Sequence, residues 1–108
     1  MADDDSFTLY DLRVEVDAIT GNCTCGLRVG DGFELHGGTL ITPPGGFCVY
    51  ALQSTLPLLP AKQRPLHPND WMLSDTRIHC PDPACGTIMR VDRVAERTIH
   101  HGDVSAQS

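Results

Sequence analysis

The chain has 108 residues, of which 41% are hydrophobic and 20% are charged, and its formal net charge is −6. This length and composition fit one globular domain with a modest core. The acidic balance argues against binding to nucleic acid or to an anionic membrane surface. No apolar run approaches the roughly 20 residues of a membrane-spanning helix, and the acidic start is unlike a signal peptide, so a cytoplasmic location is expected.

The chain begins with an acidic stretch, residues 1–6, which is predicted to be disordered. Between residues 10 and 18 apolar and charged side chains alternate, as they do in a strand with one buried face. Gly30-Asp31-Gly32 predicts a turn between two short extended pieces, and residues 39–41 predict another extended piece. This half of the chain is expected to form a small, curved, largely antiparallel sheet.

A Pro-Pro-Gly-Gly run at residues 43–46 interrupts regular structure, and apolar residues then recur at helical spacing. The spacing predicts one main helix over residues 47–59, which should kink or end near Thr55 because Pro57 cannot continue it. The proline-rich segment 60–70 is predicted to be a surface loop that could cover a site.

The last third of the chain contains three candidate strands, at residues 71–73, 77–79 and 87–94. Residues 97–108 become polar and are predicted to be a flexible tail. Residues 7–96 are therefore expected to form a single α+β domain, built as a small curved antiparallel sheet or half-open barrel with one main helix.

Five cysteines lie at the ends of the predicted elements, and none lies inside an apolar run. Cys23 and Cys25 share a tight loop, Cys48 precedes the helix, and Cys80 and Cys85 enclose the run CPDPAC. In a reducing compartment, clustered cysteines more often bind metal or perform chemistry than form disulfides. An odd number of thiols also cannot pair completely within the chain. The functional site is therefore expected where some of these loops meet.

Zinc is the metal expected at such a site, because it takes four sulfur or nitrogen ligands, usually from two short-spaced pairs. The pairs here would be C-x-C and C-x4-C, and neither has the common two-residue gap. An iron–sulfur cluster held by three loop cysteines is an alternative, although the spacing matches no usual ferredoxin run. Asp82 could support the ligands from the second coordination sphere, and His100 or His101 would take part only if the tail folded back.

Cys48 has a rationale of its own, because the unpaired amides at the start of a helix favour a thiolate. It could be a metal ligand or the nucleophile of a metal-free enzyme. A cysteine that simply fills space as a small apolar residue is an equally supported interpretation. Phe47, Tyr50 and Trp71 are candidates for the wall of a pocket beside the thiols.

The stretches GNCTCGLRVGDGFEL, GFCVYALQSTLPLLP and CPDP, within residues 14–94, resemble a family of small uncharacterised prokaryotic proteins. The family pattern has a cysteine before G-x2-VGDxF, one before the helix and one that opens CPDP, which correspond to Cys23, Cys48 and Cys80. The resemblance implies a site of three thiolates, one from each loop, with Cys25 or Cys85 as a potential fourth ligand. An open fourth position would suit a catalytic metal and a closed one a structural metal. The resemblance implies no particular reaction.

Three functions are compatible with these patterns. The first is a small cytoplasmic metalloprotein with a three-loop thiolate site, which could be an enzyme acting on a small molecule. The second is a protein-interaction module that a structural zinc stabilises, without catalysis. The third is a metal-free enzyme or redox protein with Cys48 as the reactive thiol, against which the missing C-x-x-C motif counts. The sequence names neither a substrate nor a partner.

Overall fold

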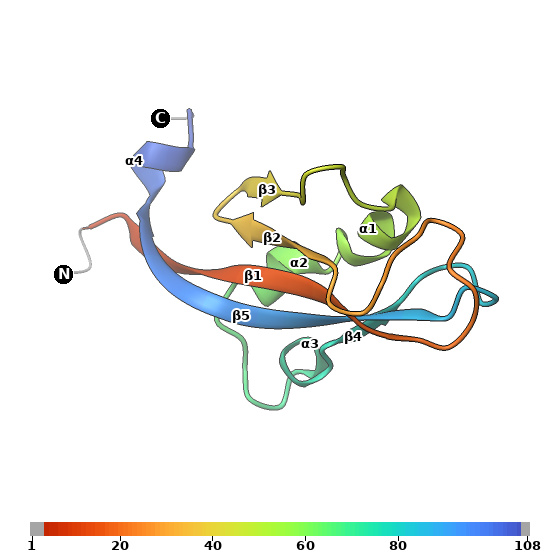
Figure 1. Ribbon diagram of the computed structural model, residues 1–108. Helices are drawn as coiled ribbons and strands as arrows, with labels where there is room; N and C mark the ends of the chain where they lie inside the picture. The colour runs from red at the N-terminus through yellow and green to blue at the C-terminus, as the bar shows by residue number, and fades with distance from the viewer. Residues whose placement is uncertain (1–3, 107–108) are drawn as a thin grey trace.

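The computed structural model describes residues 4–106 as a five-stranded open sheet with a few short helices (Figure 1). The strands lie in the order β3-β2-β1-β5-β4, and all neighbours are antiparallel. Figure 1 shows the two central strands curving together along the molecule. The predicted antiparallel α+β architecture is confirmed at this coarse level, as a sheet and not as a half-open barrel. The strands are β1 (Ser6–Ile19), β2 (Gly32–His36), β3 (Thr39–Ile41), β4 (Arg77–His79) and β5 (Thr87–His100).

Strand β1 forms where the sequence alternates, and it is longer than predicted because it pairs with β5 from Ser6 to Ile19. The pairing is irregular between Asp11 and Leu12. Leu9 and Asp11 are buried before this irregularity, and Leu12, Val14 and Val16 are buried after it. The extra residue is Val94 of β5, because Asp11 pairs with Ala95 and Leu12 with Arg93. On β1, Tyr10 packs against the same core cluster as Leu12 and Val14.

The single main helix predicted for residues 47–59 is not confirmed. Helix α1 (Val49–Thr55) has seven residues, and α2 (Leu59–Lys62) follows after a break. Pro57 has no amide hydrogen to continue α1, and the helix ends at Thr55, where the proline was expected to end it. The break turns the segment predicted as a surface loop back onto the sheet.

The other two helices are single turns that the sequence patterns missed. The predicted strand at residues 71–73 is wrong, because Asp70 accepts a hydrogen bond from the Met72 amide at 2.9 Å and starts α3 (Trp71–Ser74). Strand β5 continues beyond its predicted end and is followed by α4 (His101–Val104), so part of the predicted tail has regular structure. Residues 1–3 of the predicted lead and 107–108 of the tail lie outside the described residues. Within the described part of the chain, no helix combines the length and apolar character needed to cross a membrane.

The core lies between the sheet and helices α1 and α2. Ala51 from α1 and Leu59 from α2 are fully buried against it. The ring of Phe33 packs edge-on against Phe47, with 5.1 Å between the ring centroids and 71° between the planes. This contact ties the segment that precedes α1 to the sheet. The buried cluster comprises Leu12, Val14, Val16, Phe33, Ala51, Leu59, Met89 and Val91.

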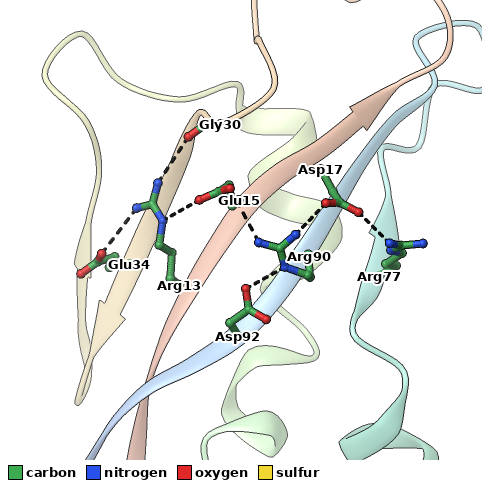
Figure 2. A network of polar contacts seen from close by, with 8 residues as sticks. All are labelled: Arg13, Glu15, Asp17, Gly30, Glu34, Arg77, Arg90 and Asp92. Atoms are coloured by element: carbon green, nitrogen blue, oxygen red, sulfur yellow. Dashed lines mark hydrogen bonds and ion pairs between the residues drawn. The ribbon is translucent and has the colours of Figure 1, made fainter.

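A network of ion pairs crosses four strands (Figure 2). Arg90 on β5 and Arg77 on β4 both contact the Asp17 carboxylate on β1, at 2.6 Å and 3.0 Å. Opposite charges on facing strands stabilise pairing modestly, and each exposed pair contributes little by itself. The network therefore holds the strands in register near the end of the sheet where β1 stops. Its members are Arg13, Glu15, Asp17, Glu34, Arg77, Arg90 and Asp92.

Asp11 is a carboxylate buried within the sheet, with 4% of its surface exposed. Its two oxygens accept hydrogen bonds from Nε and Nη2 of Arg97, at 2.8 Å and 2.7 Å, and the Gly37 amide donates at 3.2 Å. The hydrogen bonds from Arg97, with a smaller contribution from Gly37, hold the pKa of Asp11 below its ordinary value of 3.8, although burial opposes this.

The lowered pKa of Asp11 predicts a loss of stability in acid. A carboxyl whose pKa is lower when folded stabilises the protein above its unfolded pKa, and this contribution disappears as the pH falls through 3.8 and then through the folded value. We expect the free energy of unfolding, measured with urea between about pH 7 and about pH 3, to decline less steeply in Asp11→Asn than in the native protein. Asp92→Asn, on the exposed network, is the matched control. An unchanged decline in Asp11→Asn would contradict the assignment.

Candidate thiolate site

Three loops meet beyond the end of β1 and the start of β5. They are residues 20–31 after β1, residues 42–48 before α1, and residues 80–86 before β5. Figure 1 shows the first of them (orange) beside the third (cyan). These two loops are joined by backbone hydrogen bonds, from Thr20 N to Gly86 O at 3.0 Å and from Gly21 N to Cys85 O at 3.1 Å.

Two glycines permit this close approach of the loops. A Cβ atom on Gly21 would lie 2.0 Å from the carbonyl oxygen of Ala84. One on Gly86 would lie 2.2 Å from Thr20 Oγ1, and Gly86 also has a φ of +67°. Any side chain at either position would push the backbones apart. The glycines therefore determine how near the first pair of cysteines comes to the second.

All five cysteines line one cavity of about 380 Å³. The structure thus brings together Cys23, Cys48 and Cys80, and it places the two additional thiols among them. Of the described residues that line this cavity, none is a lysine, an arginine or a histidine. The remaining wall consists of Thr24, Leu27, Tyr50, Ala51, Pro81, Asp82 and Thr87.

The sulfur atoms form two groups within the cavity. The Sγ atoms of Cys25 and Cys48 are 2.8 Å apart. Cys85, which is 7% exposed, lies 2.9 Å from Thr87 Oγ1 and also interacts with the thiols of Cys23 and Cys80. All five thiols are free, and Cys25 is the exposed one. The site therefore has an outer pair and an inner group of three.

The contact makes the two thiols of the outer pair unequal in pKa. Burial raises the pKa of Cys48, but the Cys25 thiol and the amides of Ala51 and Tyr50 together bring it below 9.0. Cys48 makes no capping hydrogen bond, so we interpret these amides as dipoles at the start of α1. The hydrogen bond with Cys48, followed by partial burial and the charges of the other sulfurs, raises the pKa of Cys25 to about 11. The contact therefore makes Cys48 the more acidic thiol of the pair and Cys25 the less acidic one.

The inner group is also polarised by the backbone. Burial raises the pKa of Cys23, yet the amides of Leu27 and Cys25, and then the Cys85 and Thr87 side chains, lower it below its ordinary value. Burial is the main reason that the pKa of Cys80 is raised, and the charge of Cys85 adds to it, whereas the Asp82 amide opposes it. Backbone amides thus favour the thiolate of Cys23 in residues 20–31 and of Cys80 in residues 80–86. They do so in the second loop even though its prolines restrict the backbone.

Asp82 shapes the loop that carries Cys80 and also acts on Cys80 through its backbone. Its side chain accepts a hydrogen bond from the Ala84 amide at 3.0 Å and so shapes the turn. Its own amide favours the thiolate of Cys80, and the residue lines the cavity. Asp82 therefore supports Cys80 through its backbone, while its carboxylate is engaged in the loop.

One of the three aromatic residues expected beside the thiols lines the cavity. Tyr50 lines the cavity. Phe47 is turned into the core against Phe33 and does not line it. Trp71 lies on α3, is 59% exposed, and is also absent from the wall. Of these three aromatic residues, the lining of this cavity includes Tyr50.

The C-terminal histidines are remote from the site. His100 ends β5, whose first residue adjoins the cavity, and its ring lies 3.0 Å from Asp5 at the other end of the sheet. His101 begins the helix beyond it. Thr24 and Thr87 are polar wall residues that the sequence interpretation missed, and Thr87 is the one in contact with a thiol. The only signal in the sequence was its position two residues after Cys85, across a glycine.

The donor chemistry fits a soft metal, because thiolates suit zinc and iron–sulfur clusters. Among residues 4–106, however, no three His, Cys, Asp or Glu side chains are arranged as a metal-ligand group. The five thiols are gathered in one cavity but engaged with one another and with Thr87. A bound metal would have to draw them out of these contacts.

No family model, curated protein or solved structure matches this chain. The resemblance to small prokaryotic proteins therefore stays a prediction from the motifs.

Proposed function

We propose that this chain is a small metalloprotein whose metal is held by thiolates from three loops. The proposed ligands are Cys23, Cys48 and Cys80. One observation carries the proposal: five thiols from three separate loops share one cavity whose described wall contains no cationic side chain. Such a concentration of ionisable sulfur without a compensating charge is typical of a site for a cation.

Electrostatics supports the same conclusion. After the hydrogen bond with Cys48 for Cys25 and burial for Cys80, the charges of neighbouring cysteines contribute to the raised pKa of both thiols. Ionised sulfurs at this site would therefore repel one another. A divalent ion would replace this repulsion with attraction and would favour deprotonation of its ligands. The gathered arrangement is therefore costly as free thiolates and favourable around a metal.

The choice of ligands follows from the backbone. Amides lower the pKa of both Cys23 and Cys48 despite burial, and an amide acts in the same direction on Cys80. Backbone amides whose dipoles point at ligand sulfurs give a metal site its outer support. Zinc is the preferred metal because it takes sulfur ligands without redox chemistry, and an iron–sulfur cluster is the alternative.

The fourth position decides between an enzyme and a binding module. Cys85 is buried beside Thr87, and Cys25 is exposed beside Cys48. Binding of either would close the site and give a structural zinc in an interaction module. If neither binds, the metal has an open position toward the cavity and supplies a Lewis acid for a small molecule. Tyr50 would then form part of the wall beside that molecule.

Elemental analysis with an ultraviolet–visible spectrum, on protein purified without oxygen, tests the proposal. We expect about one zinc per chain and a featureless visible spectrum. Iron with a broad visible band would favour the cluster. Folded protein that contains neither metal, after expression in medium supplemented with both, would overturn the proposal.

A metal-free reactive cysteine is the second candidate, and one observation favours it. Cys48 has the lowered pKa in a sulfur pair whose other member, Cys25, has a pKa raised to about 11 and could act as a proton donor. No histidine base lines the described cavity. The metal analysis separates the candidates, because only this second one is compatible with folded, metal-free protein.

A further inference from the structure

The two sulfurs of the outer pair are in direct contact and belong to different loops. Their separation is 2.8 Å, whereas a disulfide bond is about 2.05 Å long. We propose that Cys25 and Cys48 form a reversible disulfide in response to a hydroperoxide, and that this bond switches the metal site off. Formation of the bond stands on the contact alone, and only its effect on metal rests on the proposed function.

Little movement is needed to form the bond. The sulfurs must approach by less than about 1 Å. Neither cysteine lies within a strand, since Cys25 is in the loop between β1 and β2 and Cys48 directly precedes α1. Closing the bond therefore leaves the pairing of the sheet intact.

Access for an oxidant also favours this pair. Cys25 is exposed and Cys48 is partly exposed, so a small hydroperoxide arriving from solvent reaches both. Cys85, in contrast, is buried and lies 2.9 Å from Thr87 Oγ1. Its loop is also held by the backbone hydrogen bonds to residues 20–22. Oxidation of the inner group would require this pairing to open.

The chemistry balances with one hydroperoxide for each disulfide. One sulfur attacks a peroxide oxygen, the O–O bond breaks, and a sulfenic acid forms while an alcohol, or water from hydrogen peroxide, leaves. The second thiol then attacks that sulfur, the S–S bond forms, and the hydroxyl leaves as water. The two cysteines are oxidised by two electrons and the peroxide is reduced by two. A dithiol reductant reverses the change by thiol–disulfide exchange.

The disulfide would remove the contribution of one loop to the metal site. Cys48 is the thiol supplied by residues 42–48, and Cys25 is one of two thiols from residues 20–31. After bonding, neither sulfur is a thiolate, and ligands are left on two loops only. Zinc requires deprotonated sulfur, so the oxidised protein is expected to release its metal.

Tryptic peptides distinguish the Cys25–Cys48 disulfide from disulfides that involve Cys80 or Cys85. Cleavage after arginine and lysine places Cys25 in residues 14–28, Cys48 in residues 29–62, and both Cys80 and Cys85 in residues 78–90. We would treat reduced protein, loaded with metal or stripped by chelator, with one equivalent of hydrogen peroxide, block the free thiols and digest it. We expect residues 14–28 linked to 29–62, with loss of the link in dithiothreitol.

Two serine variants identify the sulfurs. The link should be absent in Cys25→Ser and retained in Cys23→Ser, whose cysteine lies in the same tryptic peptide. Circular dichroism checks that both variants fold. A link to residues 78–90, or oxidation of Cys48 to sulfinic acid without any link, would overturn the assignment.

Metal release is followed in the same samples with a chromogenic chelator. Release in step with the link supports the switch, and a link without release from metal-loaded protein overturns it. Protein that binds no metal when reduced but still forms the link would refute the metalloprotein proposal and the switch together, while confirming the disulfide. The two failures are therefore distinguishable.

Discussion

Replacing Cys23, Cys48 or Cys80 by serine, one at a time, is expected to lower the metal content from about one equivalent per chain to a small fraction of it. A serine hydroxyl stays protonated at neutral pH and is not among the side chains that zinc commonly takes as ligands. Each substitution also removes the proposed ligand of one whole loop, so the other loops cannot compensate through the same backbone amides. The measurement is elemental analysis of each purified variant beside the native protein.

Two kinds of control make this result specific. His79→Gln changes the neighbour of Cys80, a potential nitrogen ligand that does not line the cavity, and it should leave the metal content unchanged. Cys25→Ser and Cys85→Ser test the fourth position, and only the variant that removes a fourth ligand should weaken binding. Metal loss confined to the Cys25 and Cys85 variants would contradict the three-loop site. Far-ultraviolet circular dichroism excludes unfolding as the cause.

The second large effect is a loss of stability, which we expect when a core side chain is truncated. Phe33→Ala should lower the free energy of unfolding by about 3–5 kcal/mol, because truncating a buried aromatic ring leaves a cavity. Phe33 is 1% exposed, and its edge-on contact with Phe47 is 5.1 Å between centroids. Phe47 directly precedes Cys48. The same substitution should therefore weaken metal binding by loosening the loop that carries this ligand.

Urea unfolding of metal-free protein measures the stability change separately from the metal. Phe33→Leu keeps most of the apolar volume and should cost considerably less. Phe7→Ala removes the same ring from a position that is 37% exposed, and it should cost less than the buried truncation. Equal losses for the Phe7 and Phe33 variants would show that the Phe33–Phe47 contact is not a main support of the core.

Several elements were predictable because their signals are local. The alternation between residues 10 and 18 produced β1, and Pro57 ended α1 where a residue without an amide hydrogen should end it. Trp71 was misassigned because bulky apolar residues suit a strand, whereas the preceding Asp70 caps a helical turn. The length of β5 was underestimated because its second half owes its conformation to pairing with β1. Partner strands are not visible in a local pattern.

The candidate site shows the same division between local and distant signals. The positions of cysteines at loop tips could be recognised from turn residues and prolines. Their convergence depends on hydrogen bonds between residues 20–22 and 84–86, which are more than 60 positions apart in the chain. The direct contact of Cys25 with Cys48 depends further on how the segment before α1 packs through Phe47. No spacing rule within one segment contains that information.

The loop pairing at Gly21 and Gly86 also has a consequence for the whole sheet. It fixes one end of the β1–β5 ribbon, and from there Val16 is placed opposite Met89 and Val14 opposite Val91. If β5 slipped by one residue along β1, Met89 and Val91 would turn out of the core toward solvent. Only glycine tolerates the contacts that close this end. The junction that brings the thiols together therefore also helps to set the register of β1 and β5. That register determines which side chains of β5 are buried.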